Sequence, residues 1–183
     1  RYARMGWTMV VEPASPPLKT RHTHEELNDI PIVDKMCFLL LDSNRILLEY
    51  LAEGDMYKFK NTIKWFLQAT KSYAIKLVDP GVAVPWSLGK GYGLDIDESI
   101  EPYGITPRDI VVNLCKANIE LKLPHTIHIH CNRLGIPGNL STTIRTMEST
   151  SHLTCGELNI HITHVQFNSY SGESWVDIRS GAE

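Results

Sequence analysis

The sequence has few cysteines and no long hydrophobic run, and both features narrow its class. Its four cysteines, Cys37, Cys115, Cys131 and Cys155, form no CxxC pair, which fits neither a zinc finger nor a disulfide-rich secreted scaffold. The longest strongly apolar run, 37–41, is far too short to span a bilayer. No secretory signal is visible. We therefore expect a cytoplasmic protein with reduced thiols and no membrane span.

The sequence also lacks an excess of positive charge. The net charge is −3, and no basic stripe is present, which argues against a nucleic-acid partner. The glycine-rich run Gly89–Gly93 lacks the GxxxxGK[ST] pattern, so we expect no phosphate-binding loop there. The chain is 43% hydrophobic and 21% charged over 183 residues, which is ordinary for one globular domain. We treat residues 1–183 as part of a single domain.

Apolar segments alternate with helical patterns along the chain. Residues 12–25 are expected to form a loop because Pro13, Pro16 and Pro17 block regular structure. Strands are expected at 8–11, 36–41, 73–78, 126–131 and 158–165. This alternation predicts a parallel α/β sheet. A doubly wound sheet and a (β/α)8 barrel both satisfy it, although a whole barrel needs about 250 residues.

Capping residues mark the expected helix ends. Gly54 is placed to end a helix over 44–53. Asp55, Thr106 and Asn139 are placed to begin the next three helices. The segment 79–105 is long and carries no clear element, which is typical of a functional or mobile loop.

Lys76 lies inside an apolar strand. Alternation places Ile75 and Leu77 on one face of this strand and Lys76 on the other. A buried lysine is costly unless it is paired or chemically changed. One interpretation is an edge-strand lysine that reaches solvent. The other is a lysine carbamylated by CO2, which would form an anionic bridge between metal ions.

Histidines occur near the ends of two later strands. His128 and His130 are two residues apart and share a face, and neutral imidazole is a common zinc ligand. We expect His130, nearer the strand end, to be a ligand and His128 to be a hydrogen-bonded core residue. His161 and His164 are three apart, so strict alternation favours only His161 on the inner face, unless a bulge intervenes.

A further cluster spans Arg21–Glu26. Its HxH pair, His22 and His24, could bind a metal, but this composition is more typical of a protein surface. Arg21, His22 or His24 could instead contact an anionic substrate.

Five runs of residues are long and unusual enough to be compared with known families. They are Glu12–Lys19 (EPASPPLK), Arg21–Leu27 (RHTHEEL), Tyr73–Lys76 (YAIK), Ile127–Asn139 (IHIHCNRLGIPGN) and His161–Phe167 (HITHVQF). Together they resemble the A subunits of formylmethanofuran dehydrogenases, and the similar subunit of the bacterial formyltransferase/hydrolase complex shares much of the pattern. The likeness covers essentially all of the chain in order.

The resemblance implies a (β/α)8 TIM-like barrel of the amidohydrolase type with a two-zinc centre. This chain would be an internal fragment with about strands 2 to 6. Carried over residue by residue, Lys76 matches the bridging carbamylated lysine, His130 the fifth-strand ligand and His164 the sixth-strand ligand. The match to His164 overrides the preference of alternation for His161.

Some of the residues that the family's site needs are expected outside this chain. A first-strand HxH pair is expected upstream of Arg1, and the eighth-strand aspartate, the expected general base, downstream of Glu183. We therefore expect no catalytic residue within the chain. Arg21, His22, His24, Asn132 and Arg133 are candidates for substrate binding. One departure from the family lies in the loop after the lysine, where Pro-Gly-Gly is common and this chain has Pro80-Gly81-Val82; it puts the local loop shape in doubt, not the lysine.

The implied activity is condensation of formate with methanofuran, or hydrolysis of N-formylmethanofuran, in CO2 reduction, methanogenesis or one-carbon oxidation. Partner subunits would carry a tungsten or molybdenum pterin and iron–sulfur clusters. One alternative is a zinc amidohydrolase of the dihydroorotase or aminoacylase kind, which shares the ligand scheme but not the runs 21–27 and 134–139. Another is a catalytically inactive scaffold subunit.

Overall fold

The computed structural model describes residues 1–90, 93–153, 160–172, 174 and 176–180. Its main sheet is parallel, and its strands are neighbours in chain order. These are β1 (Met9–Ser15), β2 (Asp34–Leu40), β3 (Ala74–Val78), β4 (Ile127–His130) and β5 (Ile160–Ile162). A doubly wound sheet changes direction in its strand order, whereas consecutive barrel strands are adjacent. The predicted α/β class is confirmed, and the sequential order is consistent with part of a barrel.

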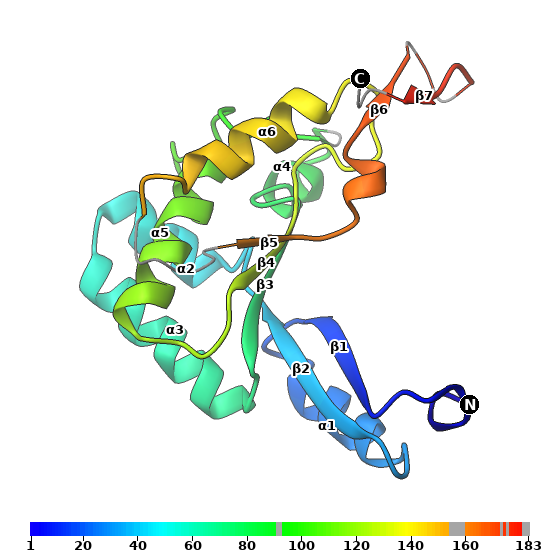
Figure 1. Cartoon of the computed structure of the whole chain (residues 1–183). Coiled ribbons are helices and arrows are strands. Elements are labelled where there is room, and N and C mark those ends of the chain that lie inside the picture. The colour runs from blue at the N-terminus through cyan, green and yellow to red at the C-terminus, as the bar shows by residue number, and fades with distance from the viewer. Residues whose placement is uncertain (91–92, 154–159, 173, 175, 181–183) are drawn as a thin grey trace.

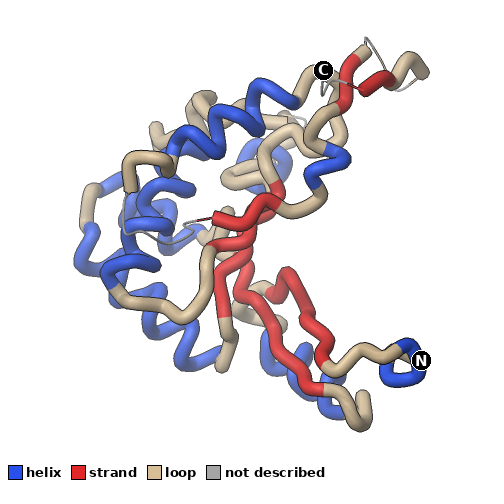
Figure 2. Tube along the Cα trace, viewed as in Figure 1, coloured by secondary structure: helices blue, strands red, loops and turns tan. Residues whose placement is uncertain are grey.

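Helices connect the strands and gather on one side of the sheet (Figures 1 and 2). In Figure 1, α2, α3 and α5 lie together on that side. The α-helices are α1 (Thr20–Asn28), α2 (Arg45–Glu53), α3 (Met56–Thr70), α4 (Ala83–Ser87), α5 (Pro107–Glu120) and α6 (Leu140–Ser149). The smaller elements are η1 (Ala3–Met5), η2 (Val165–Phe167) and the antiparallel pair β6 (Tyr170–Ser171) and β7 (Arg179–Ser180).

Within the described ranges, no helix has both the length and the apolar character that a membrane crossing requires.

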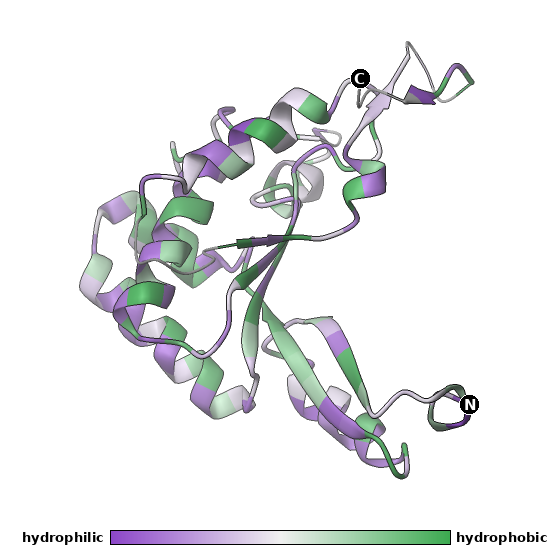
Figure 3. Ribbon diagram, in the orientation of Figure 1, coloured by the Kyte–Doolittle hydropathy of each residue, from purple (hydrophilic) through white to green (hydrophobic). Residues whose placement is uncertain are grey.

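The two faces of the sheet differ in chemistry. Strand residues on the helix side are fully buried and form one core with α2, α3 and α5. They include Leu39, Ile75, Leu77, Ile127 and Ile129, and Leu41, directly after β2, joins the same core. Phe38, Lys76 and His128 alternate with these residues and lie on the opposite face. In Figure 3 the start of β2 is hydrophilic and its middle is hydrophobic, as expected for a strand that enters the core. The face of the sheet opposite the helices therefore carries the polar side chains of Lys76 and His128, and we call it the inner face.

Three helix boundaries confirm the predicted caps. Gly54 ends α2 in the left-handed conformation, and the side chain of Asp55 accepts a hydrogen bond from the Lys58 amide at 3.0 Å. Thr106 forms a reciprocal capping box with Asp109. The side chains of Asp55 and Thr106 thus satisfy amides that a helix start would otherwise leave unbonded.

The predicted loop over 12–25 is wrong. Strand β1 continues through Pro13 to Ser15, and α1 begins at Thr20. Proline is tolerated here because β1 is at the edge of the sheet. Its pairing with β2 shifts register between Glu12 and Ser15.

Asn139 precedes α6 but does not cap it. The side-chain Nδ2 of Asn139 donates to the Phe167 carbonyl at 2.6 Å, and its side-chain Oδ1 accepts from the backbone amide of Tyr170 at 3.3 Å. The predicted cap is therefore a link between the start of α6 and the segment that follows β5.

The loop after β3 depends on Gly81 rather than on Val82. Gly81 has φ +81°, and a Cβ added there would lie 2.2 Å from Cδ1 of Ile100, which is 1% exposed. Val82 has φ −64° and ψ −28°, values that any residue adopts. The doubt that Val82 raised about the loop shape therefore has no conformational basis.

This difference predicts unequal effects of three substitutions. Gly54→Ala should lower the free energy of unfolding by about 1 kcal/mol, because Gly54 is left-handed at φ +73° with open space around it. Gly81→Ala should cost roughly 3 kcal/mol, because overpacking adds to the same backbone strain. Val82→Gly should cost at most about 1 kcal/mol. Urea unfolding would measure all three, and equal losses for the two alanine variants would contradict the packing argument.

Candidate metal centre at the strand ends

Lys76 is a buried lysine in the middle of the sheet. Its side chain is 2% exposed, and its Nζ donates a hydrogen bond to Oγ1 of Thr163 at 2.9 Å. Strand β3 lies between β2 and β4, so the interpretation as an edge lysine that reaches solvent is wrong. Burial lowers the pKa of this amine to about 8. Lys76 forms no ion pair with any residue that the structure describes.

His130 and His164 come together at the ends of their strands. Their ring centroids are 4.2 Å apart at an interplanar angle of 69°. His161, the residue favoured by alternation, stacks on His128 with centroids 4.3 Å apart. The four histidines thus form two layers along the strands. His128 and His161 make the first layer, and His130 and His164 make the second, nearer the strand ends.

A left-handed residue resolves the conflict with alternation. His164 has φ +58° and ψ +40°, a left-handed conformation that is uncommon for residues other than glycine, although asparagine, aspartate and histidine adopt it more often than the rest. It ends the extended chain of β5, so that Thr163 contacts Lys76 while His164 contacts His130. A single left-handed residue at the strand end therefore brings His164 to His130.

Both histidines of β4 are held in the neutral form at neutral pH. Desolvation, followed by the charges of Lys76 and His164, lowers the pKa of His130 to about 4. Desolvation, followed by His161 and other neighbouring groups, lowers the pKa of His128 to about 4. Neutral imidazole is the form that binds metal ions.

His128 has the structural position expected of it, but it is not held by the expected hydrogen bond. Its Nε2 is buried and has no hydrogen-bond partner in the described part of the chain. Ring packing against His161 and Phe38, at centroid distances of 4.3 and 4.7 Å, holds it instead.

The layer nearer the strand ends, which consists of His130 and His164, has side chains of a type that can bind a metal ion. The ring nitrogens of His130 and His164 form no hydrogen bond with any residue within 1–90, 93–153 and 160–172, so their lone pairs stay available. No three His, Cys, Asp or Glu side chains in the described ranges converge on one point. The third donor available from this chain would be Lys76, which becomes a ligand only after conversion to an anion. These residues therefore fit part of a metal centre.

Two buried aspartates were not predicted. Asp42 follows β2 and Asp79 follows β3, and burial raises the pKa of each to about 6. Asp42 accepts a hydrogen bond from the Ser43 hydroxyl at 2.8 Å, while the Oδ1 atoms of Asp42 and Asp79 have no described partner. An aspartate directly after an apolar strand was the available sequence signal. Thr163 was also missed, because only tertiary structure brings it to Lys76.

The cluster Arg21–Glu26 lies on α1 and does not join this centre. Arg21 pairs with Glu25 at 3.0 Å, and His22 lies 3.2 Å from Glu26. His24 contacts the Thr70 carbonyl at 2.9 Å. The contacts of Arg21 and His22 are made on the exposed surface of α1. Substrate contact by these residues stays a prediction.

Asn132 and Arg133 follow β4 and differ in orientation. Asn132 is 1% exposed and donates to the Pro80 carbonyl at 3.0 Å, while its Oδ1 has no described partner. Arg133 has φ +59°, and its guanidinium lies 4.0 Å from Asp95. Asn132 thus ties the loop after β4 to the loop after β3, and Arg133 turns toward an ion-pair network.

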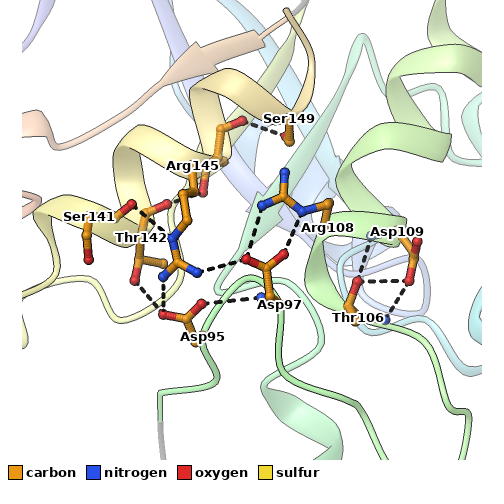
Figure 4. Close-up of polar contacts among 10 residues, drawn as sticks. Asp95, Asp97, Thr106, Arg108, Asp109, Ser141, Thr142, Arg145 and Ser149 are labelled. Carbon is orange, nitrogen blue, oxygen red and sulfur yellow. Dashed lines mark hydrogen bonds and ion pairs between the residues drawn. The ribbon is translucent and has the colours of Figure 1, made fainter.

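That network anchors the long segment 79–105, which also contains α4. Asp95 binds Arg145 at 2.6 Å, and Asp97 lies between Arg108 and Arg145 at 2.6 and 2.8 Å (Figure 4). The segment is therefore tied to both α5 and α6.

The buried amine predicts a pH-dependent stability in zinc-free, CO2-free protein. Because the pKa of Lys76 falls from 10.5 to about 8 on folding, the unfolded chain binds more protons between these values. Stability should therefore rise with pH through this window. Lys76→Met should raise the free energy of unfolding at pH 7 by on the order of 2 kcal/mol, with the gain shrinking above pH 8.

Urea titrations from pH 6 to 10.5 would test this prediction. The matched control is Lys116→Met, since Lys116 lies exposed on α5. A Lys76→Met variant no more stable than the wild type at pH 7 would refute the account of a costly buried amine.

Comparison with known proteins gives two curated relatives. Protein FwdA of Methanocaldococcus jannaschii is 43% identical over 188 aligned positions, which cover 100% of this chain and 33% of the relative. The A component of the formyltransferase/hydrolase complex Fhc of Methylorubrum extorquens is 34% identical, with 92% of this chain and 30% of the relative covered. The chain thus spans about a third of the length of these relatives.

A solved structure agrees with the sequence comparison. A chain in the crystal structure of FhcABCD from Methylorubrum extorquens in complex with methylofuran superposes with a TM-score of 0.89 at 34% identity. The match covers 99% of this chain and 32% of that one. No family model matches. By sequence and by fold, the chain therefore belongs to the family of A subunits of formylmethanofuran dehydrogenase and formyltransferase/hydrolase complexes.

Proposed function

We propose that the complete subunit carrying this sequence joins formate to the amine of methanofuran, or hydrolyses the N-formyl product, at a dinuclear zinc centre. The centre would lie in a (β/α)8 barrel of the amidohydrolase type, with Lys76, carbamylated, as the bridging ligand. The observation that carries the proposal is the buried Lys76 amine, which lies beside neutral histidines and whose hydrogen-bond partner among the described residues is the hydroxyl of Thr163.

The residues of this chain would contribute charge and neutral donors. Lys76 as a carbamate would replace a cation with an anion and offset the charge of two divalent ions. His130 and His164 would each supply an imidazole nitrogen. Zinc, when bound, polarises a formyl carbonyl and lowers the pKa of a bound water toward about 7. The aspartate that would move the proton is expected, by the family resemblance, downstream of Glu183.

Substrate contacts within the chain are also part of the proposal. Asn132 is supported by its buried side chain and its unpartnered Oδ1 at the end of β4. Arg133, Arg21, His22 and His24 lie in segments that follow β4 or β1, and the C-terminal ends of parallel strands are where α/β enzymes bind ligands. These residues would contact the anionic or furan-bearing parts of methanofuran.

The partners follow from the relatives. A relative in the FhcABCD structure is a subunit of a multi-subunit complex that binds methylofuran. We propose that the protein carrying this sequence works in a comparable cytoplasmic complex. In the dehydrogenase version, formate would come from CO2 reduction at a tungsten or molybdenum pterin with iron–sulfur clusters on partner subunits.

Replacement of Lys76 should remove the metal centre. In the complete subunit, Lys76→Ala should lower bound zinc from two ions to fewer than one and N-formylmethanofuran hydrolysis by at least about a thousandfold, because the bridging anion is lost. Added propionate should restore part of both by supplying a carboxylate, while propionamide should not. Zinc analysis and hydrolysis rates would measure the effects.

Retention of two zinc ions by Lys76→Ala would reject the bridging role. Absence of zinc from the wild-type complete subunit would instead favour the inactive scaffold.

The two histidines of the last motif form a matched pair. His164→Asn should reduce zinc content by about one ion per subunit, because a ligand is lost while asparagine tolerates the left-handed backbone. His161→Asn should leave zinc unchanged and lower only the stability. Zinc analysis of both variants after equal purification would decide, and the reverse pattern would reassign the ligand to His161.

A further inference from the structure

We infer that Thr163 is a positioning residue for Lys76, whose hydroxyl orients the lysine nitrogen for uptake of CO2 and then fixes the plane of the resulting carbamate. This inference rests on the proposed function. It assigns a role to a residue that is neither a metal ligand nor a substrate contact in that proposal.

The hydrogen-bond directions at Thr163 follow from its neighbours. The hydroxyl lies 3.0 Å from the carbonyl oxygen of Ile129 and 2.9 Å from Nζ of Lys76. A carbonyl oxygen can only accept, so the single hydroxyl hydrogen is used there. Oγ1 must therefore present a lone pair to Lys76, and one N–H of Lys76 points at Thr163.

This arrangement suits both forms of the lysine. As a neutral amine, Lys76 keeps one N–H on Thr163 and directs its lone pair elsewhere. When that lone pair attacks the carbon of CO2, an N–C bond forms, a C–O π pair moves to oxygen, and one proton leaves to water. The carbamate retains one N–H, which can still donate to Thr163. Because the carbamate group is planar, an anchored N–H also fixes the direction of its two oxygens.

The pairing of the chain at Thr163 with β4 does not depend on the Thr163 hydroxyl. The Thr163 amide donates to the same Ile129 carbonyl at 2.9 Å, and this bond does not need the side chain. The left-handed turn at the next residue then directs His164 to His130. Removal of the hydroxyl should therefore leave the path of the chain, and the place of His164, intact.

The test uses the complete subunit, reconstituted with zinc at increasing concentrations of 13C-bicarbonate. The carbamate signal in 13C NMR and the bound zinc are both measured. Thr163→Val should need roughly tenfold more bicarbonate than the wild type for half-maximal carbamate, the effect of losing one hydrogen bond to a charged group. Thr163→Ser should stay within about twofold.

The matched control is Thr70→Val. Thr70 is half-buried at the end of α3 and donates to the Phe66 carbonyl at 2.7 Å, so its replacement removes a comparable threonine hydrogen bond before β3 begins. It should match the wild type. Should Thr163→Val fail to fold, Thr163→Ala gives the same test with less bulk.

The outcomes separate the two claims. If wild type forms carbamate and binds zinc, and a folded Thr163→Val or Thr163→Ala variant has the same bicarbonate dependence, the role of Thr163 is overturned while the proposed function stands. If wild type forms no carbamate and binds no zinc, the proposed function fails, and the role of Thr163 fails with it.

Discussion

A cation placed in the centre of a parallel sheet constrains everything around it. Lys76 is almost fully buried, and in the described structure its hydrogen-bond partner is the hydroxyl of Thr163. The desolvation of Lys76 outweighs the nearby charges of Cys131 and Asp42 and favours the neutral amine, and the lowered pKa expresses this preference. A neutral amine is also the nucleophile that CO2 requires. The same burial that makes this lysine costly to the fold therefore prepares it for conversion to an anion.

The second constraint is the turn that follows β5. A left-handed histidine costs of order 1–3 kcal/mol and persists only where its surroundings hold it. Here the Phe167 amide donates to the His164 carbonyl at 2.8 Å, and the Phe167 carbonyl accepts from Gly135 and Asn139. The loop after β4 and the start of α6 thus hold the turn, which explains why Asn139 does not act as a helix cap.

The sequence predicts what local physics controls. Alternation placed Lys76 on the face opposite Ile75 and Leu77, and capping residues marked the end of α2 and the starts of α3 and α5. The predictions were wrong where contacts between residues far apart in the sequence determine the backbone conformation. Pro13 lies in a strand because that strand is at an edge, and the turn at His164 depends on partners at 135 and 139. The choice of His164 as a candidate ligand therefore came from family resemblance, and periodicity alone would have chosen His161.

The two histidine layers show why a shifted pKa does not by itself identify a ligand. His128 and His130 both have a pKa lowered to about 4, chiefly by desolvation. Yet the ring of His128 is covered by His161 and Phe38, and its Nε2 is buried. His130 lies one step closer to the strand end and meets His164, beside the residue that binds Lys76. Position along the strand, more than basicity, distinguishes the layer suited to chemistry from the layer that packs the interior.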